Sequence, residues 1–405
     1  MSKLRFVTPR TKKRRSVALS ERRALKMAES AHAYVRGNTI QFYQWLEEHD
    51  GKQIPRGPDV WICGDCHIGN LGPVSDAAGN VEVQIRDLDQ TVIGNPAHDI
   101  IRLGLSLAMA ARGSDLPGVT TAQMLEATMR GYRRALSKTL RNETPPEAIA
   151  LTFKNALQRK WRHLAEERLE DTTPRIPLGK NFWPLMKAER GAIEALFQEE
   201  SFRALLTGLE HRDSDSGVRL LDAAYWVKGC SSLGGLRFVA LAGIGSRKKE
   251  ALHGDLCLID IKQAGPAAAP RSSDTIMPRD NAERVVTGAR ALSPHLGDRM
   301  LAARMLDKSV VVRELLPQDI KFDMERLSVD EAIGVAQYLA HVLGRAHWRQ
   351  MDPSTREGWA SDLKRASTKT LNAPSWLWSS VVDLVARHEV AYLEHCRKYA
   401  LGNRS

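Results

Sequence analysis

Two short motifs constrain this chain of 405 residues more than any other feature of its sequence. A short apolar run ends at the loop Gly-Asp-Cys-His-Ile-Gly-Asn of residues 64–70, and the alternating run 81–85 ends just before the acidic motif Asp-Leu-Asp of residues 87–89. Both runs are typical of strands. Gly, Asp and Asn also cluster in ordinary turns, so single residues carry little information. The joint pattern, with Asp87 17 residues after Asn70, instead predicts two loops around one cleft.

This combination of residue types suits phosphoryl transfer, which asks little covalent chemistry of a protein. The reaction needs a carboxylate beside the acceptor hydroxyl and hard oxygen ligands for the Mg²⁺ that accompanies the nucleotide phosphates. We expect Asp65 to be the catalytic base, with His67 in the catalytic loop as an orienting residue rather than a proton carrier. We expect the metal ligands to be Asn70, Asp87 and Asp89, with Asp87 as the bridging carboxylate.

A second pattern is a Gly/Ser-rich turn between two strand-like runs. Its candidate phosphate-binding positions are Gly229, Ser231, Ser232 and Gly234. Such a turn lets backbone N–H groups approach phosphates closely, although an ordinary hairpin has the same composition. One hairpin further along, a strand-like run carries Lys262, which resembles the lysine that holds nucleotide phosphates in kinases. Kinases pair that lysine with a helical glutamate, for which Glu283 is the candidate, and the run 310–316 would lead into the hinge at the adenine.

The first two motifs look like the catalytic loop and metal motif of aminoglycoside and choline kinases. More closely, the chain resembles the family catalogued as domain of unknown function 2252, whose members carry a Gly-Asp-x-His-x-x-Asn-x-Gly loop and an Asp-Phe-Asp-Glu motif. Residues 64–72 match the first pattern, while Leu88 and Gln90 depart from the second at positions that would not bind metal. The family's Trp-Asp-x-x-Arg-Leu helix corresponds to residues 98–103. The resemblance implies that Asp99 is a buried acid that braces the catalytic loop.

The order of these parts differs from that of an ordinary kinase, in which the Gly-rich loop, lysine and hinge precede the catalytic loop. Here the catalytic loop comes first, so the order is circularly shifted, which is tolerable because chain ends tend to lie close together at the surface. A helix ending near His347 resembles the helix that precedes the catalytic loop in small-molecule kinases. The resemblance thus implies an α+β fold, namely a two-lobed, circularly permuted protein-kinase-like fold with a mostly antiparallel small-lobe sheet and a helical large lobe.

We expect five regions along the chain. They are a basic flexible N-terminal tail (1–18), the catalytic-loop and metal-site part of the large lobe (19–111), a helical bridge of that lobe (112–220), the small nucleotide-binding lobe (221–320) and C-terminal helices that complete the large lobe (321–405). Apolar periodicity predicts helices over 20–48, 99–111, 121–170 and from 329 onward. It predicts strands over 60–63, 81–85, 256–262 and 309–316, and strands on both sides of the Gly-rich turn within 225–239.

Composition narrows the class of protein. The apolar share of 43% is ample for a packed core, and the sequence contains no long apolar run typical of a membrane span. Five cysteines and a polar, basic N-terminus without an apolar signal segment favour a reducing cytoplasm. The sequence from Cys63 to His67 matches a haem-attachment pattern, but such attachment usually needs export. His253-Gly254-Asp255 mimics a catalytic loop, and we interpret it as a hairpin turn.

Three functions remain open at this level. The first is transfer of the γ-phosphate of magnesium-ATP to a hydroxyl of an unidentified, small-molecule acceptor, which is an enzymatic kinase reaction. The second is a nucleotide-binding pseudokinase, or an enzyme that transfers AMP, because the sequence does not fix the orientation of the nucleotide. The third is a basic nucleic-acid-binding protein, suggested by the net charge of +11 and the arginine-rich N-terminus. The acceptor and the oligomeric state are not encoded in any motif we recognise.

Overall fold

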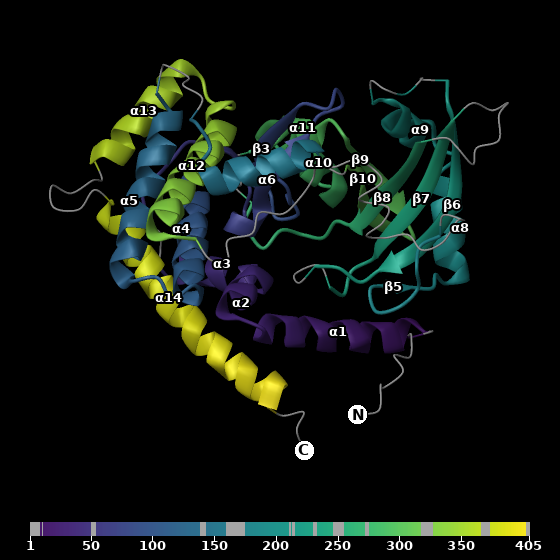
Figure 1. The fold of residues 1–405 in the computed structure, drawn as a ribbon, viewed down its shortest axis with the longest axis horizontal. Coiled ribbons are helices and arrows are strands. Elements are labelled where there is room, and N and C mark those ends of the chain that lie inside the picture. Colours follow the sequence, from purple (N-terminus) through teal and green to yellow (C-terminus); the bar gives the residue numbers. More distant parts are fainter. Residues whose placement is uncertain are drawn as a thin grey trace.

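The computed structural model describes most of the chain. The described residues are 9, 11–49, 54–137, 143–158, 175–209, 212, 215–229, 233–245, 255–271, 275–316, 327–365 and 373–401. They form a mixed α+β structure with antiparallel sheets. Figure 1 shows the largest sheet at one end of the molecule and a group of long helices at the other, with small strand pairs and shorter helices between them. None of the helices in these ranges combines the length and apolarity that a bilayer crossing requires.

The largest sheet has six strands in the order β5-β6-β7-β8-β10-β9, and each neighbouring pair is antiparallel. The strands are β5 (Phe182–Trp183), β6 (Gly217–Trp226), β7 (Arg237–Gly245), β8 (Asp255–Gln263), β9 (Met300–Met305) and β10 (Lys308–Leu315). Alternate residues of β7 enter different cores, with Phe238 and Ala240 on one face and Val239 and Leu241 on the other. Because both faces of β7 are covered, the residues from Phe238 to Ile244 are all apolar or glycine, although side chains in a strand alternate between the two faces.

Two short helices cover one face of this sheet. They are α8 (Lys187–Leu196) and α9 (Glu200–Thr207), which bury Ile193 and Phe202 in the same core as β6, β7 and β8. The sequence analysis assigned residues 112–220 to a helical bridge of the other region, and this boundary is wrong. From β5 onward the chain already packs with the six-stranded sheet, because Trp183 is fully buried in its core.

The helical part contains four helices of 18 or more described residues. Its helices, with those that connect it to the sheet, are α2 (Ala31–Gly37), α3 (Thr39–Glu48), α4 (Pro96–Gly113), α5 (Gly118–Ala135), α6 (Glu147–Gln158), α10 (Asn281–Leu292), α11 (Pro294–Gly297), α12 (Val329–Trp348), α13 (Pro353–Arg365) and α14 (Ser375–Cys396), which continues as η2 (Arg397–Leu401). Helix α4 is buried on nearly all sides, which explains its almost uninterrupted apolar sequence. Helices α5 and α12 approach closely at Gly131, where a Cβ would stand 2.0 Å from the Gln337 backbone oxygen.

Two small antiparallel pairs carry the loops of the predicted site. They are β1 (Val60–Ile62) with β4 (Val92–Gly94), and β2 (Leu71–Ser75) with β3 (Val81–Ile85), and the single 3₁₀ turn η1 (Ile68–Asn70) enters β2. The predicted strands at 60–63 and 81–85 are confirmed. The sequence analysis missed β2 and β4, which are short and contain glycine or proline.

Helix α1 (Lys12–Ala28) corrects the expectation of a flexible tail through residue 18. The Thr11 side chain accepts the Arg14 N–H and caps the helix. In Figure 1, α1 runs along one edge of the molecule from the six-stranded sheet to α2. Its last turn also meets the C-terminal helix, because the Tyr392 hydroxyl donates to the Ala28 backbone oxygen at 3.1 Å. The first and last helices of the chain are therefore neighbours.

Arg15 fixes α1 to the sheet, although its neighbours are surface residues. Its Nη1 donates to Glu189 Oε1 at 2.6 Å, its Nη2 donates to the Pro184 backbone oxygen at 3.0 Å, and its guanidinium lies 4.2 Å from the ring centroid of Tyr225. Arg15 and Glu189 are 4% and 2% exposed. A basic run in the sequence thus contains one buried anchor, which composition does not distinguish from its neighbours.

We predict that Arg15→Met lowers the free energy of unfolding by about 3 kcal/mol, because it leaves the Glu189 carboxylate buried without its partner. The matched change Arg14→Met, at an exposed position one residue earlier, should cost within about 0.5 kcal/mol. Urea unfolding of both variants measures the difference. Equal stability of the two variants would show that Arg15 does not anchor α1.

Candidate active site

The loop that follows β1 turns sharply at Gly64. Its backbone has a φ of 74°, and a Cβ at this position would stand 2.2 Å from the Gln90 backbone oxygen. Any other residue would meet both the left-handed backbone penalty and a backbone atom that cannot move aside. Glycine therefore allows the catalytic loop, residues 64–70, to lie directly against the loop of residues 87–90.

Asp99, in the first turn of α4, holds the start of the catalytic loop. Its carboxylate accepts the backbone N–H groups of Cys63 at 2.6 Å and Gly64 at 2.9 Å. Nε2 of His347, from α12, lies 3.2 Å from the same carboxylate, while its Nδ1 lies 2.9 Å from the Tyr132 hydroxyl. Asp99 is 1% exposed and His347 is fully buried. The bracing role that the family resemblance implies for Asp99 matches this geometry.

Asp65 lies on the cleft wall and is oriented from behind by an arginine. Arg102 of α4 donates from Nε and Nη2 to Asp65 Oδ1 at 3.0 and 2.8 Å, and it also donates to the Val35 backbone oxygen at 2.9 Å. Arg102 is 1% exposed. Burial raises the pKa of Asp65, and the charge of Arg102 limits this rise. The carboxylate therefore has a fixed direction at the surface of the cleft.

Asn70 joins the two loops. Its Nδ2 donates to the backbone oxygens of Asp87 at 2.7 Å and Asp65 at 3.3 Å, and its Oδ1 accepts the Asp87 N–H at 2.6 Å. These backbone partners fix which end of the amide is the oxygen. Asn70 is 2% exposed, and its oxygen already accepts a hydrogen bond. The amide thus holds the loop of Asp87 in place, and because an amide oxygen has two lone pairs, the role of Asn70 as a metal ligand stays a prediction.

Asp87 and Asp89 follow β3, and Lys262 reaches both from β8 of the six-stranded sheet. Lys262 Nζ lies 3.2 Å from Asp87 Oδ1 and forms a second ion pair with Asp89 Oδ2. The Lys262 side chain is 12% exposed, whereas that of Asp87 is 52% exposed and faces the open cleft. The lysine and the acidic motif therefore meet in one place, although 175 residues separate Lys262 from Asp87.

The charges of this cluster shift its pKa values in opposite directions. Burial acts to raise the pKa of Asp87, but Lys262, Arg313 and Arg237 together outweigh it and lower that pKa. Burial and the charge of Asp87 raise the pKa of Asp89. For Lys262, burial acts to lower the pKa, and the two carboxylates outweigh it and raise the pKa. At neutral pH the cluster is thus a charged ammonium beside an ionised Asp87.

The donor set fits a magnesium ion that arrives with phosphates. Mg²⁺ is usually bound by one or two carboxylates and completes its shell with waters and phosphate oxygens. Asp87 and Asp89 supply two carboxylates on one loop. Within the described ranges, no group of three or more His, Cys, Asp or Glu residues could hold a metal ion. The two carboxylates therefore do not make a complete protein site for a metal by themselves.

The cleft around these carboxylates is strongly basic. Besides Asp65, Asp87 and Asp89, its charged lining residues are Lys26, Arg36, Arg86, Lys228, Arg237 and Arg313. Arg237 is held in the wall by two hydrogen bonds to Asp260, at 2.9 and 2.6 Å. Arg36 of α2 forms no ion pair with any residue that the structure describes. A cleft with this excess of positive charge suits a polyanion.

The Gly-rich turn is the β6–β7 hairpin, and it opens onto the same cleft. Gly229 lines the cleft, and both Gly229 and Gly234 have left-handed φ values of 96° and 116° that favour glycine. The Tyr225 hydroxyl donates to the Gly235 backbone oxygen at 2.7 Å and fixes the base of the hairpin. The other predicted phosphate-binding positions, Ser231 and Ser232, lie outside the described residues, as do His253 and Gly254.

His67 lines the cleft and is buried in its wall. Burial, together with the charges of Arg36 and Arg102, lowers its pKa well below the usual value, so the ring is neutral. Its Nδ1 has no hydrogen-bond partner among the residues that the structure places. A neutral, buried imidazole agrees with an orienting role better than with that of a proton carrier.

Glu283 is not the partner of Lys262. It is exposed on α10, and the carboxylates at Lys262 are those of Asp87 and Asp89. The next residue, Arg284, is 1% exposed and donates to the backbone oxygens of Asp89 and Gly265, each at 2.9 Å. Helix α10 thus supports the acidic loop through an arginine that the sequence analysis missed.

One comparison with known proteins bears on this site. A family described as "Uncharacterized protein conserved in bacteria", DUF2252, matches residues 15–398. The chain belongs to the DUF2252 family. No curated protein and no solved structure matches it. The family match includes every described residue that lines the cleft, from Lys26 to Arg313, so the whole site lies within the DUF2252 domain.

Four residues of the DUF2252 site were missed from the sequence because their partners are distant in the chain. They are Arg102, Arg237, Asp260 and Arg284. Arg102 had a signal, since it occupies the arginine position of the family's Trp-Asp-x-x-Arg-Leu helix. Buried arginines that bind backbone oxygens, as Arg284 does, leave no periodic pattern that distinguishes them from surface arginines.

We predict that Gly64→Ala destabilises the protein more than Gly79→Ala. Both positions have a left-handed φ, of 74° and 88°, but a Cβ at Gly79 has no neighbour within 4 Å. Gly79→Ala should cost about 1 kcal/mol for the backbone alone. Gly64→Ala should cost a further roughly 1–3 kcal/mol, because the new methyl group overlaps the Gln90 carbonyl. Thermal unfolding measures both, and equal costs would contradict the close packing of the two loops.

Proposed function

We propose that this DUF2252 protein transfers the γ-phosphate of magnesium-ATP to a hydroxyl of a small acceptor. The observation that carries the proposal is the contact of Lys262 with Asp87 and Asp89 in the basic cleft that Asp65 also lines. Phosphoryl transfer uses these same parts: a lysine on a sheet, paired acidic residues on a facing loop and a third carboxylate nearby. A membrane or nucleic-acid partner is not needed to explain any of them.

The arrangement of strands supports a circularly permuted, two-lobed kinase-like fold as part of the proposal. Three antiparallel strands, β6 to β8, precede helix α10, and β9 and β10 follow it, with β10 paired to β8. The Gly-rich hairpin comes first and Lys262 lies on the third strand, in register with Arg237 of β7 and Val311 of β10. The contact between α1 and the C-terminal helix supports the permutation, because it places two chain ends together.

Each residue has a proposed role in the reaction. Asp87 and Asp89 would hold Mg²⁺, which supplies charge neutralisation at the phosphates when bound. Lys262 and the backbone N–H groups of the hairpin at Gly229 would bind the phosphates. Asp65 would orient the acceptor hydroxyl and take its proton as the new bond from oxygen to the γ-phosphorus forms and the bond to the leaving ADP oxygen breaks.

Two observations favour the alternative of a nucleotide-binding protein without this turnover, or with transfer of AMP. Asp65 is bound by the buried Arg102, whose charge limits the rise of its pKa, and the Asn70 oxygen accepts the Asp87 N–H. Neither contact blocks the binding of nucleotide by Lys262 and Asp87. Binding and turnover therefore need separate tests.

Magnesium-ATP should stabilise the parent protein by mass action, by about 2.7 kcal/mol at a concentration 100-fold above Kd. Asp87→Asn should weaken binding of magnesium-ATP by at least about 10-fold, since a metal ligand is lost, and should affect metal-free ATP much less. Asp298→Asn, at an exposed position on the far end of α11, is the control. Titration calorimetry measures each affinity. If the parent protein releases no heat with magnesium-ATP and shows no thermal shift, the proposal fails.

Asp65→Asn should separate catalysis from binding. It keeps the shape of the side chain, so ATP affinity should remain within about 3-fold of the parent, while turnover with an acceptor found by a metabolite screen should fall roughly 10²–10⁴-fold. Lys262→Ala should instead weaken ATP binding. An Asp65→Asn variant with the parent's turnover would exclude Asp65 as the base and leave the binding role of the cleft intact.

A further inference from the structure

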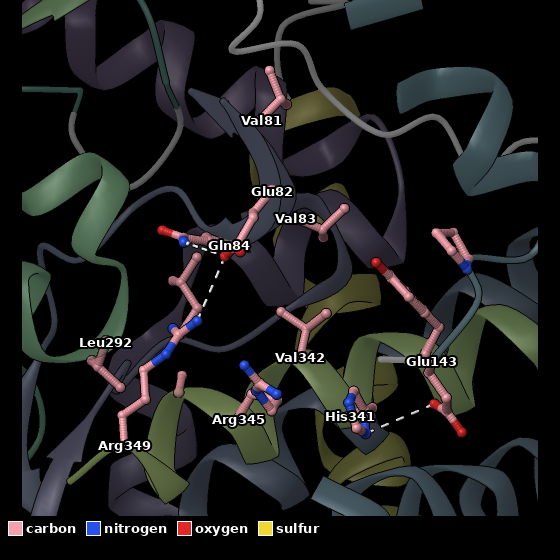
Figure 2. Close-up of a pocket in the computed structure, with 14 residues that line it drawn as sticks. Val81, Glu82, Val83, Gln84, Glu143, Leu292, His341, Val342, Arg345 and Arg349 are labelled. Carbon is pink, nitrogen blue, oxygen red and sulfur yellow. Dashed lines mark hydrogen bonds and ion pairs between the residues drawn. The ribbon is translucent and has the colours of Figure 1, made fainter. Parts of the chain in front are cut away.

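A second cavity lies between helix α12 and strand β3, and it shares no lining residue with the cleft. Figure 2 shows its side chains. One face of α12 provides Tyr338, His341, Val342, Arg345 and Arg349, and each of them has another of the set three or four residues away. Strand β3 lies across from this face, and Glu143, at the start of the segment before α6, lies beside His341 (Figure 2).

One half of this cavity presents positive charge. The Arg345 guanidinium forms no hydrogen bond or ion pair with the residues that the structure describes, and its carbon lies 6.0 Å from the ring centroid of Trp348. Arg349, one helical turn further along, has only a loose ion pair with Glu82, at 3.6 Å. Figure 2 shows both guanidinium groups in the cavity, on the same side. Two guanidinium groups so weakly engaged can bind a carboxylate or phosphate.

In the other half of the cavity, two buried polar atoms have no hydrogen-bond partner among the described residues. His341 Nδ1 and Glu143 Oε2 face each other at 3.9 Å, too far for a hydrogen bond, and both atoms are buried without a hydrogen-bond partner among the described residues. The other Glu143 oxygen accepts from Arg134 and Gln337. His341 is 7% exposed, and burial lowers its pKa, so the ring is neutral near pH 7. Buried polar atoms are normally satisfied, so a donor placed between these two would complete them.

We propose that this cavity binds a small zwitterion of the amino-acid class. Its acidic group would bind Arg345 and Arg349, and its ammonium group would donate to Glu143 Oε2 and His341 Nδ1. His341 and Arg345 are four residues apart on one helix, so the two halves are about one helical turn, roughly 6 Å, apart. The side chains of Val83, Val342 and Leu292 between and around them give the apolar wall that such ligands need.

The position of the cavity relates it to the cleft without depending on the proposed phosphotransfer. Strand β3 runs from the cavity to Asp87, and α12 runs from it to His347, which braces the catalytic loop through Asp99. A ligand here would contact both elements that position the candidate active site. Binding at the cavity can nevertheless be measured on the full chain without ATP.

Titration calorimetry of the full-length protein with single compounds tests the proposal. The zwitterions are the twenty common α-amino acids, β-alanine, γ-aminobutyrate and O-phosphoethanolamine. Acetate, inorganic phosphate and methylamine are the controls, since each carries only one of the two groups. We expect at least one zwitterion to bind with a Kd below about 1 mM and at least about 10-fold more tightly than every control. If no zwitterion binds, or if phosphate or acetate binds as tightly, the proposal is wrong and the gap at His341 holds only water.

Variants locate the bound compound. Arg345→Gln should weaken it by about 10-fold or more, and it should fold normally because the Arg345 guanidinium has no hydrogen bond to the described residues that the change would remove. Glu143→Gln should weaken zwitterions but leave phosphate unaffected. Arg304→Gln, on the exposed edge strand β9, is the matched control and should bind like the parent. Zwitterion binding that survives Arg345→Gln would place the ligand elsewhere and overturn the assignment.

Discussion

The contact of Lys262 with Asp87 and Asp89 joins the two parts of the molecule at the candidate site. The lysine belongs to the six-stranded sheet, while the carboxylates lie on a loop between the small strand pairs. Charged side chains are expensive to bury unless they are paired. Here the ammonium is largely buried and paired, while the Asp87 carboxylate remains half open to the cleft. The exposed Asp87 carboxylate can therefore bind a cation that enters the cleft together with a polyanion.

Other contacts keep this cluster in place. Asn70 binds the backbone of Asp87 on both sides, Arg284 binds the backbone of Asp89, and Asp99 holds the start of the catalytic loop. These groups are almost fully buried. The net charge of +11 is therefore not a property of a tail alone, since some arginines are structural and others line the cleft. This distribution agrees better with a nucleotide site than with a nucleic-acid surface.

Much of the local structure was predictable because it follows from short-range patterns. The strand at 81–85, the buried helix from Asp99 and the hairpin before Lys262 follow from periodicity and glycine placement. The kinase resemblance assigned Lys262 and Asp87 to a common nucleotide, but it named Glu283 instead of the acidic-loop carboxylates as the partner of the lysine. The rest depends on distant partners: Glu283 and Arg284 are adjacent in sequence, but only the packing of α10 decides which of them faces the acidic loop. Likewise, Arg15 is an anchor because Glu189 lies opposite it.

A crystal structure with Mg²⁺ and a non-hydrolysable ATP analogue is the direct test of this nucleotide site. We expect a metal ion bound by Asp87 and by phosphate oxygens, with the Lys262 ammonium moved from the carboxylates to the phosphates and Asp65 facing the γ-phosphate. We also expect the backbone near Gly229 to contact the phosphates. A nucleotide bound away from this cleft, or a Lys262 that still pairs with Asp87 while the analogue occupies another site, would contradict the proposal.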